Sequence, residues 1–285
     1  MKRMIVNADD YGHTPGVAQG IRRAHLQGIV TSTSAMMNRP AAFAEVARTA
    51  ELCPRLGVGV HLVLTSGVPE LPPEQVPSLV LPDGHFPRLD GFIDRLPGLN
   101  LDEVSAEWHA QVEKFIQARE ALPDHLDSHH HSSYFTAPLF ERMLRLAEEL
   151  GCPIRKPFAE MSAAGAEYLP AHLAGAPGYG YTPEQGQRLP LTTDKFITAF
   201  CDQGATLENL LHILREIRDD HHHETFELMC HPAVVNEELM AISDYNEPRG
   251  RELEILTSAE MKAAVKAAGI ELISFGQLLK TWQAD

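Results

Sequence analysis

Cysteine is scarce in this sequence. The chain has 285 residues and only four cysteines, Cys53, Cys152, Cys201 and Cys230, and no two of them form a C-x-x-C pair. Such distant cysteines indicate neither a disulfide framework nor a zinc knuckle. Unpaired cysteines are typical of proteins in a reducing compartment, so we expect a cytoplasmic location.

Long hydrophobic runs are also missing. No segment reaches the roughly 18 consecutive apolar residues that a membrane span requires. The sequence begins MKRMIVNADD, with two early basic residues as in a signal peptide. The apolar run that follows them stops after about three residues, far short of the apolar core of a signal peptide. We therefore expect a soluble, unexported protein without a membrane partner.

Basic residues are outnumbered by acidic ones. The chain has 24 Lys and Arg against 39 Asp and Glu, a formal net charge of −15, and its basic residues are scattered. Most of this surface would repel a phosphate backbone, so nucleic acid is not expected as a partner. The hydrophobic fraction of 44% and the charged fraction of 22% are those of an ordinary globular protein. A neutral or cationic small ligand is favoured.

The first 64 residues alternate strand-like and helix-like segments. The runs RMIVNADD, VTSTSAMM and GVGVHLVL are rich in apolar and β-branched residues, as strands are. Thr14 and Pro15 form a helix start signal and Gly28 a stop signal, and AAFAEVARTAEL continues the helical pattern. Three such alternations predict a parallel sheet.

The rest of the chain extends the pattern around two irregular excursion loops, at about 65–100, which holds seven prolines, and at about 159–192. Strands are expected at DHLDSHHH, PIRKPF, TFELMCHPA and IELISF. Helices are expected at about 102–121, 138–150, 194–202, 207–218 and 258–268, with a further helix closing the chain. The order predicts an α/β fold: an irregular or incomplete (β/α) barrel with mostly parallel strands, formed by residues 1–285 as a single domain.

Catalytic groups of such barrels lie at the C-terminal ends of the strands, and polar residues gather there in this sequence. Side chains alternate along a strand, so Asp127, His129 and His131 are expected on one face. One of these histidines beside His61 and a carboxylate would form a two-His, one-Asp set, which leaves a metal position open to water. A second histidine triplet, 221–223, follows a helical run and is interpreted as a polar connector.

The adjacent carboxylates of Asp9 and Asp10 have two interpretations. One of them could cap the following helix, a common use of Asp, although Thr14 already offers a cap. Two neighbouring carboxylates repel each other unless a cation or a proton lies between them. In the second interpretation, one carboxylate binds a metal ion and the other acts as general base toward water.

Five segments carry a family resemblance: IVNADDYG, GIVTSTSAMMN, GVGVHLVLT, HLDSHHH and ELMCHPA. In this order, across roughly residues 4–235, they resemble the motifs of the YdjC-type carbohydrate deacetylases, which include chitooligosaccharide deacetylases. The resemblance implies an irregular (β/α) barrel, one divalent metal ion, and removal of an acetyl group from an N-acetylated sugar such as N-acetylglucosamine or chitobiose. It also implies a small carbohydrate substrate and a homodimer.

Applied to this sequence, the resemblance assigns a role to each matching residue. It makes Asp10, His61 and His129 the metal ligands, Asp9 the general base, and His231 the group that protonates the leaving amine. Two imidazoles and one carboxylate suit Zn, whereas the family is usually described with Mg, so both ions stay open.

Substrate contacts are less defined by the motifs. His131 and Arg155 are the candidates for binding substrate. Family members often read DSHHHVH, whereas Ser132, Ser133 and Tyr134 follow the histidine triplet here, so a histidine usually present near the substrate is missing.

Two alternatives belong to other functional classes. A metal-dependent phosphoesterase would need a cationic phosphate clamp, for which Arg155 and Lys156 are the available pair, although the same residues could form an exposed turn. A carbohydrate-binding protein could keep the fold and lose catalysis. A serine hydrolase is not indicated, because the sequence has no G-x-S-x-G motif.

Overall fold

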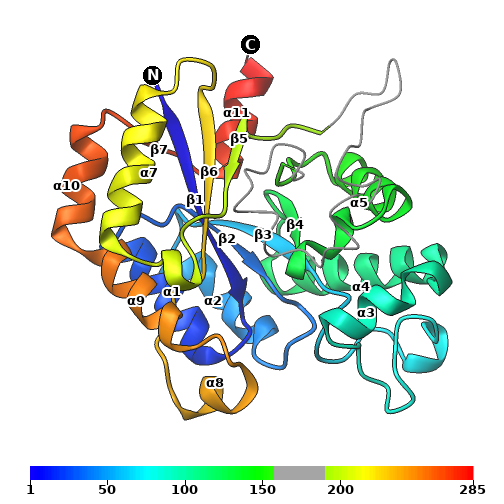
Figure 1. Ribbon diagram of the computed structural model, residues 1–285. Helices are drawn as coiled ribbons and strands as arrows, with labels where there is room; N and C mark the ends of the chain where they lie inside the picture. The colour runs from blue at the N-terminus through cyan, green and yellow to red at the C-terminus, as the bar shows by residue number, and fades with distance from the viewer. Residues whose placement is uncertain (157–189, 285) are drawn as a thin grey trace.

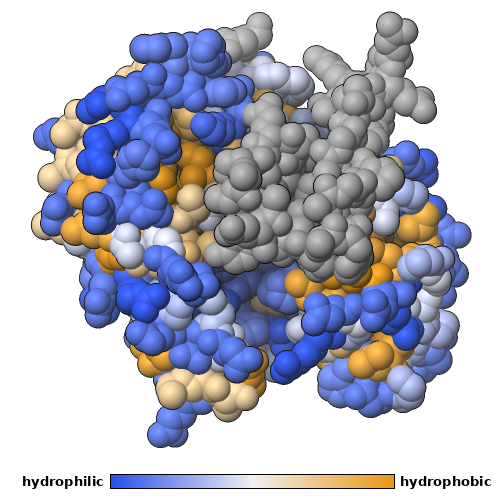
Figure 2. Space-filling view, viewed as in Figure 1, coloured by the Kyte–Doolittle hydropathy of each residue, from blue (hydrophilic) through white to orange (hydrophobic). Residues whose placement is uncertain are grey.

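The computed structural model describes residues 1–156 and 190–284. Most of the second predicted excursion loop, at 159–192, lies outside these residues. No helix within the described part of the chain is both long and apolar enough to cross a membrane. On the face shown in Figure 2, hydrophilic residues cover much of the described surface and hydrophobic residues form separate patches.

The centre of the fold is a curled parallel sheet with the strand order β4-β3-β2-β1-β6-β5 (Figure 1), and β7 pairs with the start of β1. The strands are β1 (Arg3–Tyr11), β2 (Ser32–Ala35), β3 (Gly57–Leu62), β4 (Leu126–Ser128), β5 (Lys195–Ile197), β6 (Thr225–Cys230) and β7 (Glu271–Leu272). Every recorded strand pairing is parallel. The expected incomplete (β/α) barrel is therefore confirmed.

Helices surround this sheet on its outer side (Figure 1). They are α1 (Pro15–Gln27), α2 (Ala42–Leu52), α3 (Leu89–Arg95), α4 (Leu101–Arg119), α5 (Ala137–Leu150), α7 (Leu207–Asp219), α8 (Glu237–Ile242), α9 (Glu247–Thr257), α10 (Ala259–Ala267) and α11 (Phe275–Ala284). Neighbouring pairs include α1 with α9, α2 with α4, and α7 with α10. The strands are covered on both faces, which explains why β1 begins as an unbroken apolar run.

Helix α7 illustrates how the sequence specifies these elements. Its buried residues are Leu210, Ile213, Leu214 and Ile217, a spacing that places all four on one helix face. Thr206 caps the helix by accepting a hydrogen bond from the backbone N–H of Asn209. The predicted start of α1 is likewise confirmed, because Thr14 caps it with Pro15 in its first turn.

Two predictions of secondary structure were wrong. The region expected as a helix at 194–202 holds the short strand β5, which is paired with β6 instead. The strand expected at DHLDSHHH ends at Ser128, because His130 and His131 have φ angles of 54° and 55° and form a turn. Beyond Ser128 the expected strand alternation therefore does not apply.

The excursion loop at 65–100 is more ordered than its composition suggested. It contains α3 and two 3₁₀ turns, Pro73–Gln75 and Leu96–Gly98. The fully buried Glu107 of α4 accepts hydrogen bonds from the backbone N–H groups of Glu70 and Leu71. One carboxylate therefore satisfies two loop donors and fixes the loop to the body of the fold.

Candidate metal centre and catalytic site

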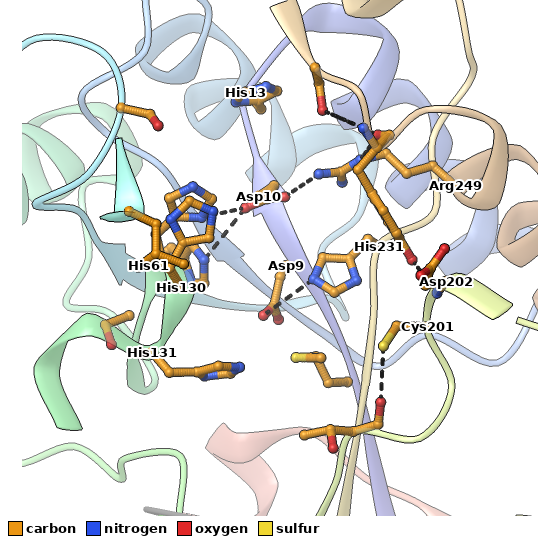
Figure 3. A pocket seen from close by; sticks show the side chains of 18 of the residues that line it. Asp9, Asp10, His13, His61, His130, His131, Cys201, Asp202, His231 and Arg249 are labelled. Atoms are coloured by element: carbon orange, nitrogen blue, oxygen red, sulfur yellow. Dashed lines mark hydrogen bonds and ion pairs between the residues drawn. The ribbon is translucent and has the colours of Figure 1, made fainter. Parts of the chain in front are cut away.

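A cavity of about 430 Å³ opens where the C-terminal ends of the strands meet. It is lined by Asp9 and Asp10 from β1, His61 from β3, His129 from the turn after β4, and His231 from the end of β6. The residues assigned to the metal and to catalysis therefore come from four separate strand ends and share one cavity (Figure 3).

Adjacent residues of a regular strand point to opposite faces, yet Asp9 and Asp10 both line the cavity. The backbone of Asp10 explains this, because its φ angle is 70° and the pairing of β1 with β2 shifts register between Ala8 and Tyr11. Asp tolerates this left-handed conformation better than most residues. The local distortion at the end of β1 thus turns two successive carboxylates toward the same space.

Three potential ligand atoms converge at the centre of the cavity. Asp10 Oδ1 lies 3.5 Å from His61 Nε2 and 3.2 Å from His129 Nδ1. Ligand atoms bound at about 2.0–2.2 Å to one ion lie roughly 3–3.5 Å apart, so the spacing fits a divalent metal. Asp10 Oδ1 is also buried and has no hydrogen-bond partner among the described residues, which suits an atom that binds an ion. We call these three residues the candidate ligand set.

A carboxylate behind His61 fixes the orientation of its ring. His61 Nδ1 lies 2.7 Å from Asp127 Oδ1, which leaves Nε2 directed toward Asp10. Ser34 donates a hydrogen bond to the other oxygen of Asp127 at 2.8 Å. Burial alone would lower the pKa of His61, but Asp127 and the other carboxylates outweigh burial and raise it to about 9 in the metal-free protein. A carboxylate behind a histidine is the usual outer support of a metal ligand.

A second cluster, formed by Asp9, His61 and Asp127, also has metal-ligand spacing, but a cation of the protein already occupies it. Arg155 donates two hydrogen bonds of 2.7 Å to Asp9, and its Nη1 lies 3.0 Å from Asp127. Its Nε donates to Glu227 at 2.7 Å. Because the guanidinium neutralises this cluster, the candidate ligand set is the better metal site.

The position of Arg155 corrects two expectations from the sequence. It is fully buried, so it does not lie in an exposed turn, and it does not line the cavity, so it is not placed to contact substrate there. The described residues 153–156 pair with the sheet only through a single bridge between Ile154 and Leu126, and the side chain of Arg155, the next residue, is buried. Burial would raise the pKa of Asp9, but Arg155 outweighs burial and holds that pKa well below its usual range.

The buried Glu227 makes the stability of the fold depend on pH. Burial raises its pKa to about 7, although Arg155 opposes the shift. Between about pH 4.5 and 7 the unfolded chain binds fewer protons at this position than the folded protein, so this group's contribution to the free energy of unfolding falls as pH rises.

We expect Glu227→Gln to remove this loss, because glutamine keeps an acceptor for Arg155 and does not ionise. As the pH rises from 4.5 to 7, the free energy of unfolding of wild type should therefore fall by up to about 3 kcal/mol relative to that of the variant. Urea titrations of both proteins at both pH values measure this change. A difference between the two proteins that stays constant with pH would contradict the assignment of the shifted pKa to Glu227.

His231 stands beside the first carboxylate. Its Nε2 lies 4.0 Å from Asp9 Oδ2, and Figure 3 shows its ring directed toward Asp9. Burial lowers the pKa of His231 to about 4, although Asp9 opposes the shift, so the ring is neutral at pH 7. Burial also lowers the pKa of His129, which favours the neutral form that binds metal.

The other histidines considered from the sequence lie in two different places. His131 lines the cavity, where a substrate could contact it. The triplet at 221–223 precedes β6 and therefore lies at the opposite end of that strand from His231, where His223 Nδ1 is 2.8 Å from Asp220. The polar connector expected there is confirmed.

The cavity residues that had no signal in the sequence include Arg249 and Tyr245. Arg249 of α9 donates a hydrogen bond to Asp10 Oδ2, and Tyr245 lies in the segment between α8 and α9. Burial would raise the pKa of Asp10, but Arg249 and the nearby histidines hold it well below its usual range. Neither residue follows a strand, so a search of strand ends could not find them.

The model of the YdjC-like protein family matches residues 3–267. A carbohydrate deacetylase of Enterococcus faecalis is 38% identical over 280 residues, which cover 97% of this chain and 98% of the relative. A carbohydrate deacetylase of Geobacillus stearothermophilus is 36% identical over 276 residues, with 97% and 98% covered. A crystal structure from Enterococcus faecalis V583, described as a cellobiose-phosphate cleavage protein, matches with a TM-score of 0.82 and 36% identity, covering 97% of this chain and 98% of that one. These matches confirm the resemblance of the five motifs, and the chain belongs to the YdjC-like protein family.

Proposed function

We propose that the protein is a metal-dependent hydrolase that removes the acetyl group from an N-acetylated sugar or oligosaccharide resembling N-acetylglucosamine or chitobiose. The observation that carries this proposal is the convergence of the candidate ligand set in a cavity that Asp9 and His231 also line. Similarity over nearly the whole chain to proteins named carbohydrate deacetylase supports a sugar amide as substrate.

The side chains around the ligand set match the needs of amide hydrolysis. A divalent ion bound there would supply Lewis-acid polarisation of the acetyl group and of water. Asp9 faces the cavity as a carboxylate, because Arg155 holds its pKa low, and it can accept the proton of the attacking water. His231 is the group placed to give a proton to the leaving amine.

The lowered pKa of His231 limits where that proton comes from. With a pKa of about 4 the imidazole starts neutral at pH 7, so it must take up a proton within the site before it can donate one. Asp9, whose Oδ2 lies 4.0 Å away, is the nearest candidate donor after it has accepted the proton of water. The proposed reaction therefore passes one proton from water through Asp9 and His231 to the amine.

The substrate could carry a phosphate group. Arg39 lines the cavity, and its Nε has no hydrogen-bond partner among the described residues, which favours an anionic ligand. The E. faecalis protein described above is named for a sugar phosphate. A phosphoesterase is the rival function, but the clamp expected for it from the sequence is not available, because Arg155 is buried among carboxylates.

Release assays with metal-free purified protein test the proposal. The panel should hold N-acetylglucosamine, diacetylchitobiose and their 6-phosphates, each with Mg or Zn returned, and both acetate and phosphate should be quantified. Acetate release from at least one sugar is expected. Release of phosphate alone would favour the phosphoesterase and contradict the deacetylase.

Substitution of the metal ligands gives a separate prediction. His61→Ala and His129→Ala should each lower the metal content of the purified protein, because each removes one of three ligand atoms. His222→Ala in the exposed second triplet is the matched control and should keep the wild-type content. Elemental analysis measures all three variants, and wild-type metal content in both site variants would contradict the ligand assignment.

The remaining expectations concern the setting of the reaction. We propose that the protein acts as a homodimer in the cytoplasm, on a small carbohydrate and without nucleic acid or membrane partners. Sedimentation should then give twice the chain mass of 31.5 kDa.

A further inference from the structure

The proposed reaction leaves unexplained the buried carboxyl group of Glu252. This residue of α9 is fully buried, and neutral donors bind both of its oxygens. The backbone N–H of His231 donates to one oxygen, and the hydroxyl of Tyr245 donates to the other at 2.7 Å. Burying an acidic group costs stability that an apolar side chain would not. Its presence directly behind His231 therefore points to a role in the site.

Tyr245 connects this carboxyl group to two walls of the cavity. Its hydroxyl also accepts a hydrogen bond of 2.8 Å from the backbone N–H of Asp202, a cavity residue after β5. Its ring meets the imidazole of His231 edge-on, with 5.6 Å between ring centroids and 75° between planes. The phenol thus touches His231 through its ring and the Asp202 segment through its oxygen.

Tyr245 also contacts Arg249, the cation that lies beside the candidate ligand set. The guanidinium of Arg249 lies over the Tyr245 ring, 5.2 Å from its centroid, and Nε donates to the backbone oxygen of Tyr245 at 3.0 Å. Arg249 in turn donates to Asp10 Oδ2, so Oδ1 alone is left facing the two histidines (Figure 3). Tyr245 therefore contacts both His231, which lies beside Asp9, and Arg249, which binds Asp10.

We infer that Tyr245, held by Glu252, is a positioning residue that fixes His231 and Arg249 in the arrangement needed for hydrolysis. The inference rests on the proposed function for its effect on turnover. Its physical basis is that a small misplacement of a catalytic group can lower the rate greatly without preventing binding. The hydroxyl of Tyr245 is the critical group, because it anchors the ring that contacts His231 and Arg249 to the buried carboxyl group of Glu252.

The test is Tyr245→Phe, which keeps the ring against His231 and Arg249 and removes the hydroxyl. We expect wild-type metal content, a KM within about threefold of wild type, and a kcat lowered by about tenfold or more. The ring nitrogens of His231, observed by ¹⁵N NMR of histidine-labelled protein, should shift or broaden. This second readout needs no substrate, so it tests the positioning even if no acetylated sugar is hydrolysed.

Tyr11→Phe is the matched control. Tyr11 is a buried tyrosine whose hydroxyl, like that of Tyr245, makes two hydrogen bonds, here with Arg22 and with the backbone of Glu45, but it does not line the cavity. It should lose similar thermal stability while kcat and the His231 ring signals stay near wild type. Unchanged His231 signals in Tyr245→Phe would overturn the inference. Equal losses of kcat in the two variants would also overturn it, because they would indicate a general effect of stability.

Discussion

Replacing Asp9 with asparagine is expected to lower kcat by about 10²–10⁴-fold while the protein stays folded and binds metal. The amide cannot accept a proton from water, so the proposed base is lost. The candidate ligand set is not changed, and Arg155 still has two carboxylates, Asp127 and Glu227, as partners. Steady-state acetate release, elemental analysis and circular dichroism on the same preparation measure these three properties.

Glu227→Gln is the matched control for this substitution, because it also removes one carboxylate from Arg155 but does not line the cavity. It should lose far less turnover than Asp9→Asn. Turnover near the wild-type rate in Asp9→Asn would refute the role of Asp9 as general base. Loss of metal in that variant would instead indicate that Asp9 supports the ligand set.

Replacing Arg155 with leucine is expected to lower the free energy of unfolding by about 3–5 kcal/mol at pH 8. The guanidinium is fully buried and is the shared partner of Asp9, Asp127 and Glu227. Without it the three carboxylates lose their common cation and can avoid their mutual repulsion only by taking up protons. Since protons are more available in acid, the loss should be smaller at pH 5 than at pH 8, as urea titrations at both values would show.

Arg142→Leu is the control for the removal of an arginine. Its ion pair with Asp102 spans 3.2 Å, but the carboxylate side chain is 87% exposed. Pairs of this kind contribute at most about 1 kcal/mol, so this variant should stay close to wild type. If the two variants lost equal stability, the buried network around Arg155 would not have the importance that its geometry indicates.

The sequence was sufficient to predict the sheet and the strand-end residues. Parallel strands buried on both faces appear as short apolar runs, and a polar residue directly after such a run must lie at the sheet edge. This reasoning brings Asp10, His61 and His231 to one cavity, where the structure also places them. The alternation rule did not apply to His129, because the turn after Ser128 places this residue.

Residues that reach the site from elsewhere could not be predicted in this way. Arg155 stands next to a second basic residue in a short segment, which resembles an exposed turn, and only the convergence of three strands shows that carboxylates surround it. Tyr245, Arg249 and Glu252 belong to a polar segment without a strand or a strong hydrophobic period. They lie beside the site because the start of α9 packs against the ends of β1 and β6, a tertiary contact that no local pattern encodes.

The central claim is that Asp10, His61 and His129 hold a divalent ion that hydrolysis of a sugar amide requires. The most direct measurement is acetate release from diacetylchitobiose by one preparation in three states: as purified, after chelation, and after Mg or Zn is returned, with His129→Ala in parallel. The account predicts that release stops on chelation, returns with the ion in the wild-type protein, and stays low in His129→Ala. Acetate release that persists after the metal is removed, or that is normal in His129→Ala, would contradict it.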